Sequence, residues 1–208
     1  VIAAILRGDI SYLRERLLAE PPPISLTPTR SDYDLNPDIR PVTRELAPAA
    51  VLLPIIARAE PTVLFTHRTP HLSRHAGQVS FPGGRLHTDD PSLVRTALRE
   101  TEEETGIGAE FIQVAGFLEG YETGTGFAIL PVVGLLRGGF VLAPDPDEVE
   151  EAFEVPLAFL LDSANRERRS MEWQGRAREF YAFNYDSHYI WGATAAILVN
   201  FADRLQAE

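Results

Sequence analysis

The sequence predicts an α/β fold in which helices cover both faces of a mixed β-sheet. Three observations support this prediction. Helix, strand and turn signals mix throughout the chain, strand-like segments lie before and after one central amphipathic helix, and a second amphipathic helix closes the chain. With 208 residues, 45% of them hydrophobic and 24% charged, the chain has the size and composition of one globular domain, with or without terminal additions.

The N-terminal part of the chain differs from the rest. Apolar side chains recur at helical spacing over residues 2–18, which predicts an amphipathic helix. Three consecutive prolines at 21–23 end this helix, and the segment up to about Leu46 is polar and contains further prolines. We therefore expect an N-terminal helix and arm over residues 1–46 and the main domain over 47–208.

The main domain is expected to begin and end with regular elements. Two strands about a turn at Glu60-Pro61 open it, residues 152–161 form a strand or the start of a short helix, and a final helix covers 194–205. The predicted strands are 49–58, 63–67, 79–81, 111–119, 127–136, 140–142, 178–185 and 189–191.

The central helix lies between Asp90 and Gly106. Asp90 is followed by Pro91, a pair typical of an N-cap and the first helical position. Gly106 can adopt the left-handed conformation that ends a helix. Side chains that recur three and four residues apart give the helix an apolar stripe to bury: Leu93, Val94, Ala97, Leu98 and Thr101.

Three carboxylates share one face of this helix. Glu100, Glu103 and Glu104 are three and four residues apart, and like charges at that spacing repel and weaken a helix. A divalent cation would offset the repulsion, because hard cations such as Mg²⁺ take oxygen ligands. At about 100° per residue, this face points a quarter-turn or more away from the apolar stripe. We therefore expect all three carboxylates to face a cleft or solvent.

The segment GRLHTDDPSLVRTALRETEEETGI (84–107) resembles the signature of the Nudix hydrolases, G-x5-E-x7-R-E-U-x-E-E-x-G-U, in which U is a bulky apolar residue. Gly84 takes the first position, and Asp90 stands where Glu is usual. Eight residues separate Asp90 from Arg99 instead of seven, and Thr101 occupies a usually aliphatic position. The remaining fixed positions match as they stand: Arg99, Glu100, Glu103, Glu104, Gly106 and Ile107.

The resemblance implies an α/β/α sandwich of the Nudix type and a set of catalytic roles. Glu100 and Glu104, assisted by Glu103, would hold Mg²⁺ or Mn²⁺, and Arg99 would orient the glutamates by ion pairing. The base that activates the attacking water would be one of these glutamates or Glu148, which lies in an acidic run after the predicted strand 140–142. The alternative for the central helix is a solvated acidic helix end, and for most of the acidic run a solvated loop.

A second motif precedes the first. Residues 64–84, LFTHRTPHLSRHAGQVSFPGG, look like the motif L-L-T-x-R-[SA]-x3-R-x3-G-x3-F-P-G-G of the Nudix subgroup that cleaves coenzyme A. Thr69 replaces the small residue, and Ser73 stands at the second arginine position with Arg74 beside it. The positions that fit in register are Leu64, Thr66, Arg68, Gly77 and the run Phe81-Pro82-Gly83-Gly84.

The residue types in this motif suit an anionic ligand. Coenzyme A carries a diphosphate and a 3′-phosphate, and arginine forks match phosphate oxygens. Arg68, Arg74 and Arg85 are the candidate contacts, although each could instead be an exposed or structurally paired arginine. Gly83 and Gly84 allow the backbone to approach a ligand or metal closely, and the resemblance suggests that a glycine carbonyl coordinates the cation.

Composition excludes several classes of function. The net charge of −11 argues against nonspecific nucleic-acid binding, and the absence of cysteine excludes disulfides and thiolate metal sites. The longest apolar runs contain proline and are too short to span a bilayer, and no signal peptide is visible, so we expect a cytoplasmic protein without membrane or nucleic-acid partners.

The sequence therefore predicts a metal-dependent diphosphatase that converts coenzyme A and water to 3′,5′-ADP and 4′-phosphopantetheine. One alternative is the same chemistry on another nucleoside diphosphate, such as ADP-ribose or a diadenosine polyphosphate. NADH is disfavoured because the cysteine zinc site common in that branch is impossible here. The other alternative is a catalytically silent binding module, although such modules usually lose glutamates that this chain retains.

Overall fold

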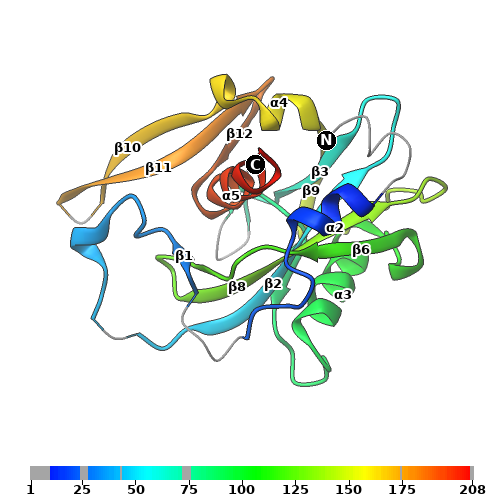
Figure 1. The fold of residues 1–208 in the computed structure, drawn as a ribbon, viewed down its shortest axis with the longest axis horizontal. Helices are drawn as coiled ribbons and strands as arrows, with labels where there is room; N and C mark the ends of the chain where they lie inside the picture. The colour runs from blue at the N-terminus through cyan, green and yellow to red at the C-terminus, as the bar shows by residue number, and fades with distance from the viewer. Residues whose placement is uncertain (1–9, 24–27, 43, 72–75, 174, 207–208) are drawn as a thin grey trace.

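The computed structural model describes residues 10–23, 28–42, 44–71, 76–173 and 175–206. Within them the chain forms one large mixed sheet with a helix on each face and a smaller antiparallel sheet beside it (Figure 1). This arrangement confirms the predicted α/β fold with helices on both faces of a mixed sheet.

The large sheet is organised around two long parallel strands. β2 (Ala47–Ile56) and β8 (Phe127–Leu136) pair along their whole length, from Ala47 opposite Phe127 to Ile56 opposite Leu136. β2 continues through a short turn into β3 (Thr62–Arg68), which confirms the predicted hairpin. The other strands of this sheet are β1 (Arg30–Ser31), β4 (Val79–Ser80), β5 (Gly83–Arg85), β6 (Ile112–Phe117), β7 (Tyr121–Glu122) and β9 (Val149–Pro156).

Alternate residues of β2 supply the two halves of the core. Ala50 and Leu52 face helix α3 (Leu93–Thr105), whereas Leu53 and Ile55 face helix α5 (Gly192–Gln206). This is the period-2 alternation of a strand buried on both faces. The described chain also contains a short helix, α4 (Leu157–Leu161). Three single 3₁₀ turns lie at Pro37–Ile39, Ala109–Phe111 and Ser163–Asn165.

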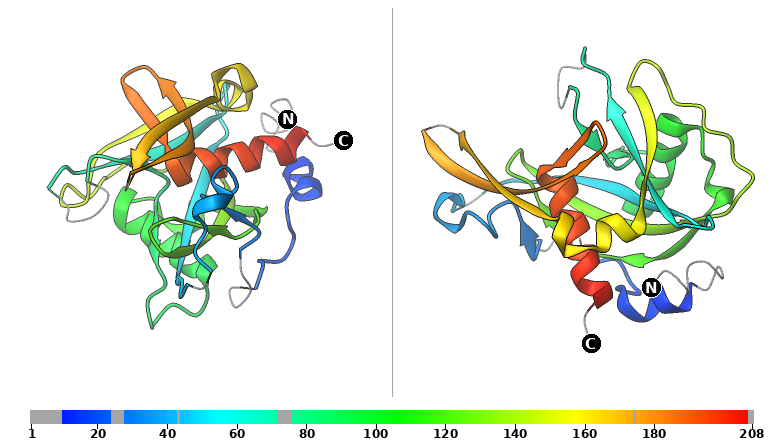
Figure 2. Two further views of the ribbon diagram at one scale, coloured as in Figure 1. Left: turned by 90° about the vertical axis from the view of Figure 1, so that its left-hand side faces the viewer. Right: turned by 90° about the horizontal axis from the view of Figure 1, so that it is seen from above.

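The smaller sheet consists of β10 (Glu167–Trp173), β11 (Arg176–Tyr185) and β12 (His188–Trp191). Both views in Figure 2 show α5 between this sheet and the large one. Sequence patterning did not predict β10. Glu167, Arg168, Arg169 and Ser170 place polar side chains on both of its faces, so the strand lacks the apolar alternation by which strands are detected.

The N-terminal segment packs on the main domain. Helix α2 (Ser11–Arg16) buries Leu13 in the core shared with α5, and its C-cap Leu17 is buried there too. Further along, β1 pairs in parallel with β7 at one end of the large sheet. The helix ends at Arg16 instead of residue 18, and residues 2–9 of the predicted helix lie outside the described residues. The division of the chain at residue 46 stays a prediction.

Two expectations about the α3 region were wrong. The N-cap of α3 is Ser92, whose hydroxyl accepts the Arg95 N–H, so the helix begins two residues later than Asp90-Pro91 suggested. Residues 140–142 do not form a strand. The chain after them crosses the C-terminal end of α3, where the N–H of Ala143 donates to the carbonyl of Thr105 (2.9 Å).

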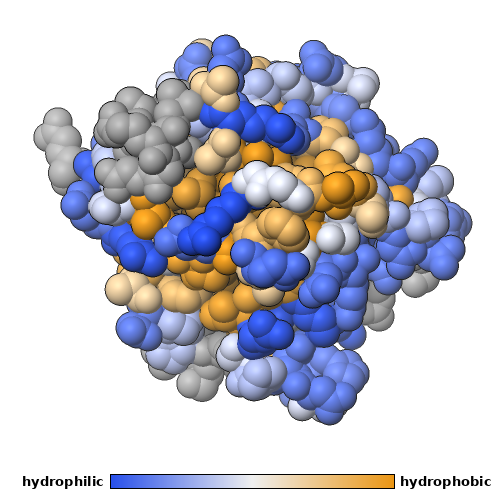
Figure 3. Space-filling model, turned by 90° about the vertical axis from the view of Figure 1, so that its right-hand side faces the viewer, coloured by the Kyte–Doolittle hydropathy of each residue, from blue (hydrophilic) through white to orange (hydrophobic). Residues whose placement is uncertain are grey.

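One face of the molecule carries an apolar patch. On the side that lies to the right in Figure 1, apolar side chains form a patch with hydrophilic side chains around it (Figure 3). No helix among the described residues is long and apolar enough to cross a membrane.

Candidate functional site

The three carboxylates of α3 occupy different environments. Glu103 is 59% exposed, Glu100 is 18% exposed and Glu104 only 3%. The expectation that all three face a cleft or solvent was therefore wrong for Glu104. Helical spacing places a residue on one side of its own helix, but it does not show which other segment covers that side. Here the covering segment is β5.

The two glycines of β5 allow this close contact. The N–H of Gly83 donates to Oε2 of Glu104 (3.3 Å). A Cβ atom on Gly84 would lie 2.4 Å from the carboxyl carbon of Glu100, and one on Gly83 would lie 2.4 Å from the carbonyl oxygen of Ala50. Gly83 also has φ of 154°, which side-chain-bearing residues rarely adopt. The lack of a side chain at Gly84 thus lets the Glu100 carboxylate lie directly on β5, and the lack of one at Gly83 lets β5 lie close to β2.

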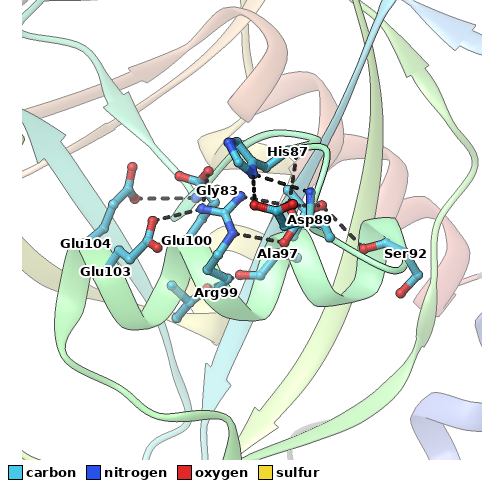
Figure 4. A network of polar contacts seen from close by, with 12 residues as sticks. Gly83, His87, Asp89, Ser92, Ala97, Arg99, Glu100, Glu103 and Glu104 are labelled. Carbon is cyan, nitrogen blue, oxygen red and sulfur yellow. Dashed lines mark hydrogen bonds and ion pairs between the residues drawn. The ribbon is translucent and has the colours of Figure 1, made fainter.

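Arg99 connects the start of α3 to its carboxylates. Its Nε and Nη2 donate to Oδ1 and Oδ2 of Asp90 (2.9 and 2.8 Å), and its Nη1 reaches Oε1 of Glu100 (2.9 Å) and Oε2 of Glu103 (2.8 Å) (Figure 4). Hydrogen bonding from Arg99 holds the pKa of Asp90 well below its usual value, although burial opposes the shift. The contacts are those expected of a residue that orients the two glutamates. Asp90, which does not cap the helix, instead anchors Arg99.

Arg68 lies on the other side of the site, at the end of β3. The pairing of β3 with β9 shifts register between His67 and Arg68, and such a bulge re-aims the side chain beside it. Nη1 of Arg68 pairs with Oε1 of Glu104 at 3.2 Å. Burial is the main cause that raises the pKa of Glu104 to about 8, with Arg68 acting in the opposite direction.

Glu148 lies beside the same carboxylates. The loop before it is held to the end of α3, because the N–H of Asp145 donates to the carbonyl of Glu104 (3.3 Å) and the N–H of Glu148 donates to the carbonyl of Asp145 (3.1 Å). The Glu148 carboxylate contributes to raising the pKa of both Glu100 and Glu104, for which burial is the largest cause. The fold thus brings together Glu148 and α3, which are far apart in sequence.

Of the other two predicted arginine contacts, the structure describes only Arg85. Arg74 is outside the described residues, as is its neighbour Ser73. The guanidinium of Arg85 lies 4.8 Å above the centre of the Phe127 ring, which is a cation–π contact and not a contact with the carboxylates. Phe81 is buried against Phe65, so it is a core residue.

The donor set suits a hard divalent cation. Glu100, Glu103, Glu104 and Glu148 offer carboxylate oxygens around the Gly83-Gly84 backbone, and oxygen is the ligand that Mg²⁺ and Mn²⁺ prefer. As the described side chains stand, no three Asp, Glu or His residues are gathered closely enough to hold a metal ion. The arrangement therefore provides suitable ligands, of which Glu104 is engaged by Arg68. A hollow of about 510 Å³ lies on the outer side of α3 and is lined by Arg99 and Glu103 but not by Glu100 or Glu104.

Thr101 shows why a polar residue is tolerated at a usually aliphatic position of the motif. The residue is fully buried, and its hydroxyl donates to the carbonyl of Ala97 at 2.7 Å. Thr105 makes the same contact one turn later, with the carbonyl of Thr101. A buried hydroxyl that bonds within its own helix leaves no unsatisfied donor in the core.

Comparison with known proteins agrees with this geometry. A family model described as a NUDIX domain matches residues 46–174, which is more than half of the chain. The chain belongs to the Nudix hydrolase family. It is therefore a hydrolase of the class that acts on the diphosphate bond of small nucleoside diphosphate derivatives, generally with divalent metal ions.

Individual relatives support the same assignment. A Nudix hydrolase NudL from Photorhabdus laumondii, described as uncharacterized, is 42% identical over 158 residues, which are 76% of this chain and 84% of the relative. A NudL from Yersinia pestis, also described as uncharacterized, is 41% identical over 157 residues, covering 76% of this chain and 79% of its own. A MutT/nudix family protein from Enterococcus faecalis shares the fold at 17% identity, with a TM-score of 0.51 over 81% of this chain and 65% of that one.

Proposed function

We propose that this Nudix hydrolase cleaves the diphosphate of coenzyme A or its derivatives, giving 3′,5′-ADP and 4′-phosphopantetheine. The observation that carries the proposal is the position of the upstream motif. Its Arg68 and its Gly83-Gly84 pair lie in contact with Glu104 and Glu100 of the Nudix helix. Residues typical of coenzyme A cleavage and residues of the general Nudix signature thus form one site.

The charges of the site suit such a ligand. Mg²⁺ or Mn²⁺ held by Glu100 and Glu104, with Glu103 assisting, would neutralise the diphosphate and lower the pKa of a bound water. Arg99 keeps the Glu100 and Glu103 carboxylates in place through its fork on Asp90. Glu103 and Glu148 are the candidates for the base, and both lie next to the proposed ligands.

We assign the two arginines of the upstream motif to different phosphates of coenzyme A. Arg68 is held at Glu104 and is therefore assigned to the diphosphate. Either Arg68 or Arg74 could have bound the 3′-phosphate on sequence grounds, and with Arg68 at the diphosphate we assign it to Arg74, which lies outside the described residues. A protein with net charge −11 needs such local positive charges to hold a polyanion.

A substrate panel tests the proposal. The protein is incubated with Mg²⁺ and, separately, with coenzyme A, ADP-ribose, NADH and nucleoside triphosphates, and the products are separated by chromatography. We expect coenzyme A to be cleaved fastest, with 3′,5′-ADP as a product. Faster cleavage of ADP-ribose would contradict the proposed substrate, and no metal-dependent cleavage of any compound would contradict the catalytic assignment.

A further inference from the structure

The carboxylate of Glu104 has both of its oxygens engaged. Oε1 accepts from Nη1 of Arg68, and Oε2 accepts from the backbone N–H of Gly83. The side chain is nearly inaccessible, so solvent supplies little compensation for its charge. A cation that binds Oε1 therefore competes directly with the Arg68 guanidinium.

Arg68 is able to leave this position. Its backbone is fixed, because its N–H donates to the carbonyl of Gln78 and its carbonyl accepts the N–H of Gly77. Its side chain, in contrast, is 21% exposed and carries a flexible stem below a guanidinium with five N–H donors. A rotation of the side chain can move the charge while β3 and β9 stay in place.

We propose that Arg68 is the counter-ion of Glu104 in the metal-free enzyme and exchanges Glu104 for the diphosphate of the ligand when a divalent cation binds. Charge is balanced in both states. Before the exchange Arg68 neutralises Glu104, and afterwards the cation neutralises Glu104 while Arg68 pairs with a phosphate oxygen. The inference rests on the proposed diphosphate site. It adds that the cation and the diphosphate each strengthen the binding of the other, because the cation releases Arg68 from Glu104.

Binding measured without metal tests the exchange. The probe is α,β-methylene-ADP, a nucleoside diphosphate that cannot be hydrolysed at the bridge. It is titrated calorimetrically in the presence of EDTA, at a pH above the raised Glu104 pKa of about 8, so that the carboxylate is charged. Glu104→Gln removes the charge that holds Arg68, so we expect this variant to bind the probe about tenfold more tightly than the unmutated protein. The double variant Arg68→Ala/Glu104→Gln should lose that gain.

A matched control separates the exchange from a general loss of negative charge. Glu100→Gln removes another carboxylate of the candidate site, one that pairs with Arg99 instead of Arg68. We expect Glu100→Gln to gain much less affinity than Glu104→Gln in EDTA. Equal gains in the two variants, or no gain in Glu104→Gln, would overturn the proposal.

A second measurement serves if Glu104→Gln does not fold. Arg68→Ala should weaken binding of the probe by about tenfold in Mg²⁺ but leave it unchanged in EDTA, where Arg68 is engaged. Losses of the same size in both conditions, or in neither, would contradict the exchange. Binding with Mg²⁺ in a protein that does not cleave coenzyme A would overturn the proposed substrate and leave the exchange intact.

Discussion

At the scale of single residues, Glu104 has the most unusual environment in the site. It is a buried carboxylate whose pKa is raised to about 8, mainly by burial. Groups with strongly shifted pKa values tend to mark functional sites. In this case the shift has a direct structural cause, since Glu100 and Glu148 lie nearby and β5 excludes solvent.

Replacing Glu104 by glutamine tests its role in catalysis. The variant Glu104→Gln keeps the shape of the side chain and an oxygen for the Gly83 N–H, so the protein should fold. It removes the charge of a proposed metal ligand, and we expect kcat to fall by roughly a thousandfold. The same substitution at the exposed Glu102, on the same helix, provides the control and should leave kcat unchanged. Near wild-type turnover in folded Glu104→Gln would remove Glu104 from the catalytic site.

Asp90 gives a prediction about pH. Its folded-state pKa lies below the ordinary value of 3.8, so its contribution to stability is fully present at neutral pH and is lost as the pH falls below 3.8. Asp90→Asn should lower the free energy of unfolding by about 2 kcal/mol at pH 7. The difference between the two proteins should shrink below pH 4 in urea titrations. A difference that stays constant down to pH 3.5 would mean that the charge of Asp90 is not the source of its contribution to stability.

At the scale of elements, the contact between β5 and α3 builds the site. The two glycines of β5 touch different neighbours, so alanine should have different effects at each. In Gly83→Ala the new methyl meets the backbone of β2, and we expect a loss of about 1–3 kcal/mol in the free energy of unfolding.

In Gly84→Ala the new methyl meets only the end of the Glu100 side chain, which can move. We expect little loss of stability but a loss of about a hundredfold in kcat, because displaced catalytic groups lose alignment. Thermal melting and steady-state kinetics on both variants distinguish the two effects. The reverse result, with Gly84→Ala unstable and Gly83→Ala merely slow, would contradict the described packing.

The same elements show how much of the structure the sequence predicts. The strands with an apolar repeat, and the central helix apart from its starting residue, follow from local patterns, because burial on one or both faces leaves a readable period. β10 leaves no such period and is recognised only through its pairing with β11. Local patterns fail where a second segment decides the outcome.

The site illustrates this limit. Spacing places Glu100, Glu103 and Glu104 on one face of α3, but the burial of Glu104 depends on β5, which approaches from elsewhere in the chain. The pair between Arg68 and Glu104 further depends on a bulge in β9, where Glu150 has no partner in β3 between the pairs of His67 and Arg68, and this bulge has no sequence signal of its own. The resemblance to a known motif supplied the candidate residues of the site, and only the structure supplied their contacts.

At the scale of the whole molecule, the proposed substrate makes a quantitative prediction. A charge-assisted contact with the 3′-phosphate is worth about 1.5–3 kcal/mol, which corresponds to roughly ten- to a hundredfold. We expect kcat/KM for coenzyme A to exceed that for its 3′-dephospho form by this factor. Arg74→Ala should shrink the ratio and leave activity on the dephospho form largely intact, whereas Arg68→Ala should lower kcat/KM for both substrates.

The unmutated protein provides the first check. Equal kcat/KM values for coenzyme A and its dephospho form would show that no residue recognises the 3′-phosphate. A diphosphatase of broader specificity would then describe the protein better. A ratio that shrinks in Arg68→Ala instead of Arg74→Ala would reverse the assignment of the two arginines.

The parallel pairing of β2 with β8 has a consequence for synthesis of the chain. β2 leaves the ribosome early, but Phe127–Leu136 follow only after β3, β5 and α3 have been made. During that interval a long apolar strand lacks its longest partner, and an unpaired strand edge invites pairing with another chain. Pro48 and Pro54 lie within β2 and have no N–H to donate. They do not interrupt the edge that waits for β8, because Pro48 faces β5, where its carbonyl accepts the N–H of Leu86, whereas Ala47 donates to Gly126 on the β8 side. The nascent chain therefore keeps an open strand edge until β8 has been made.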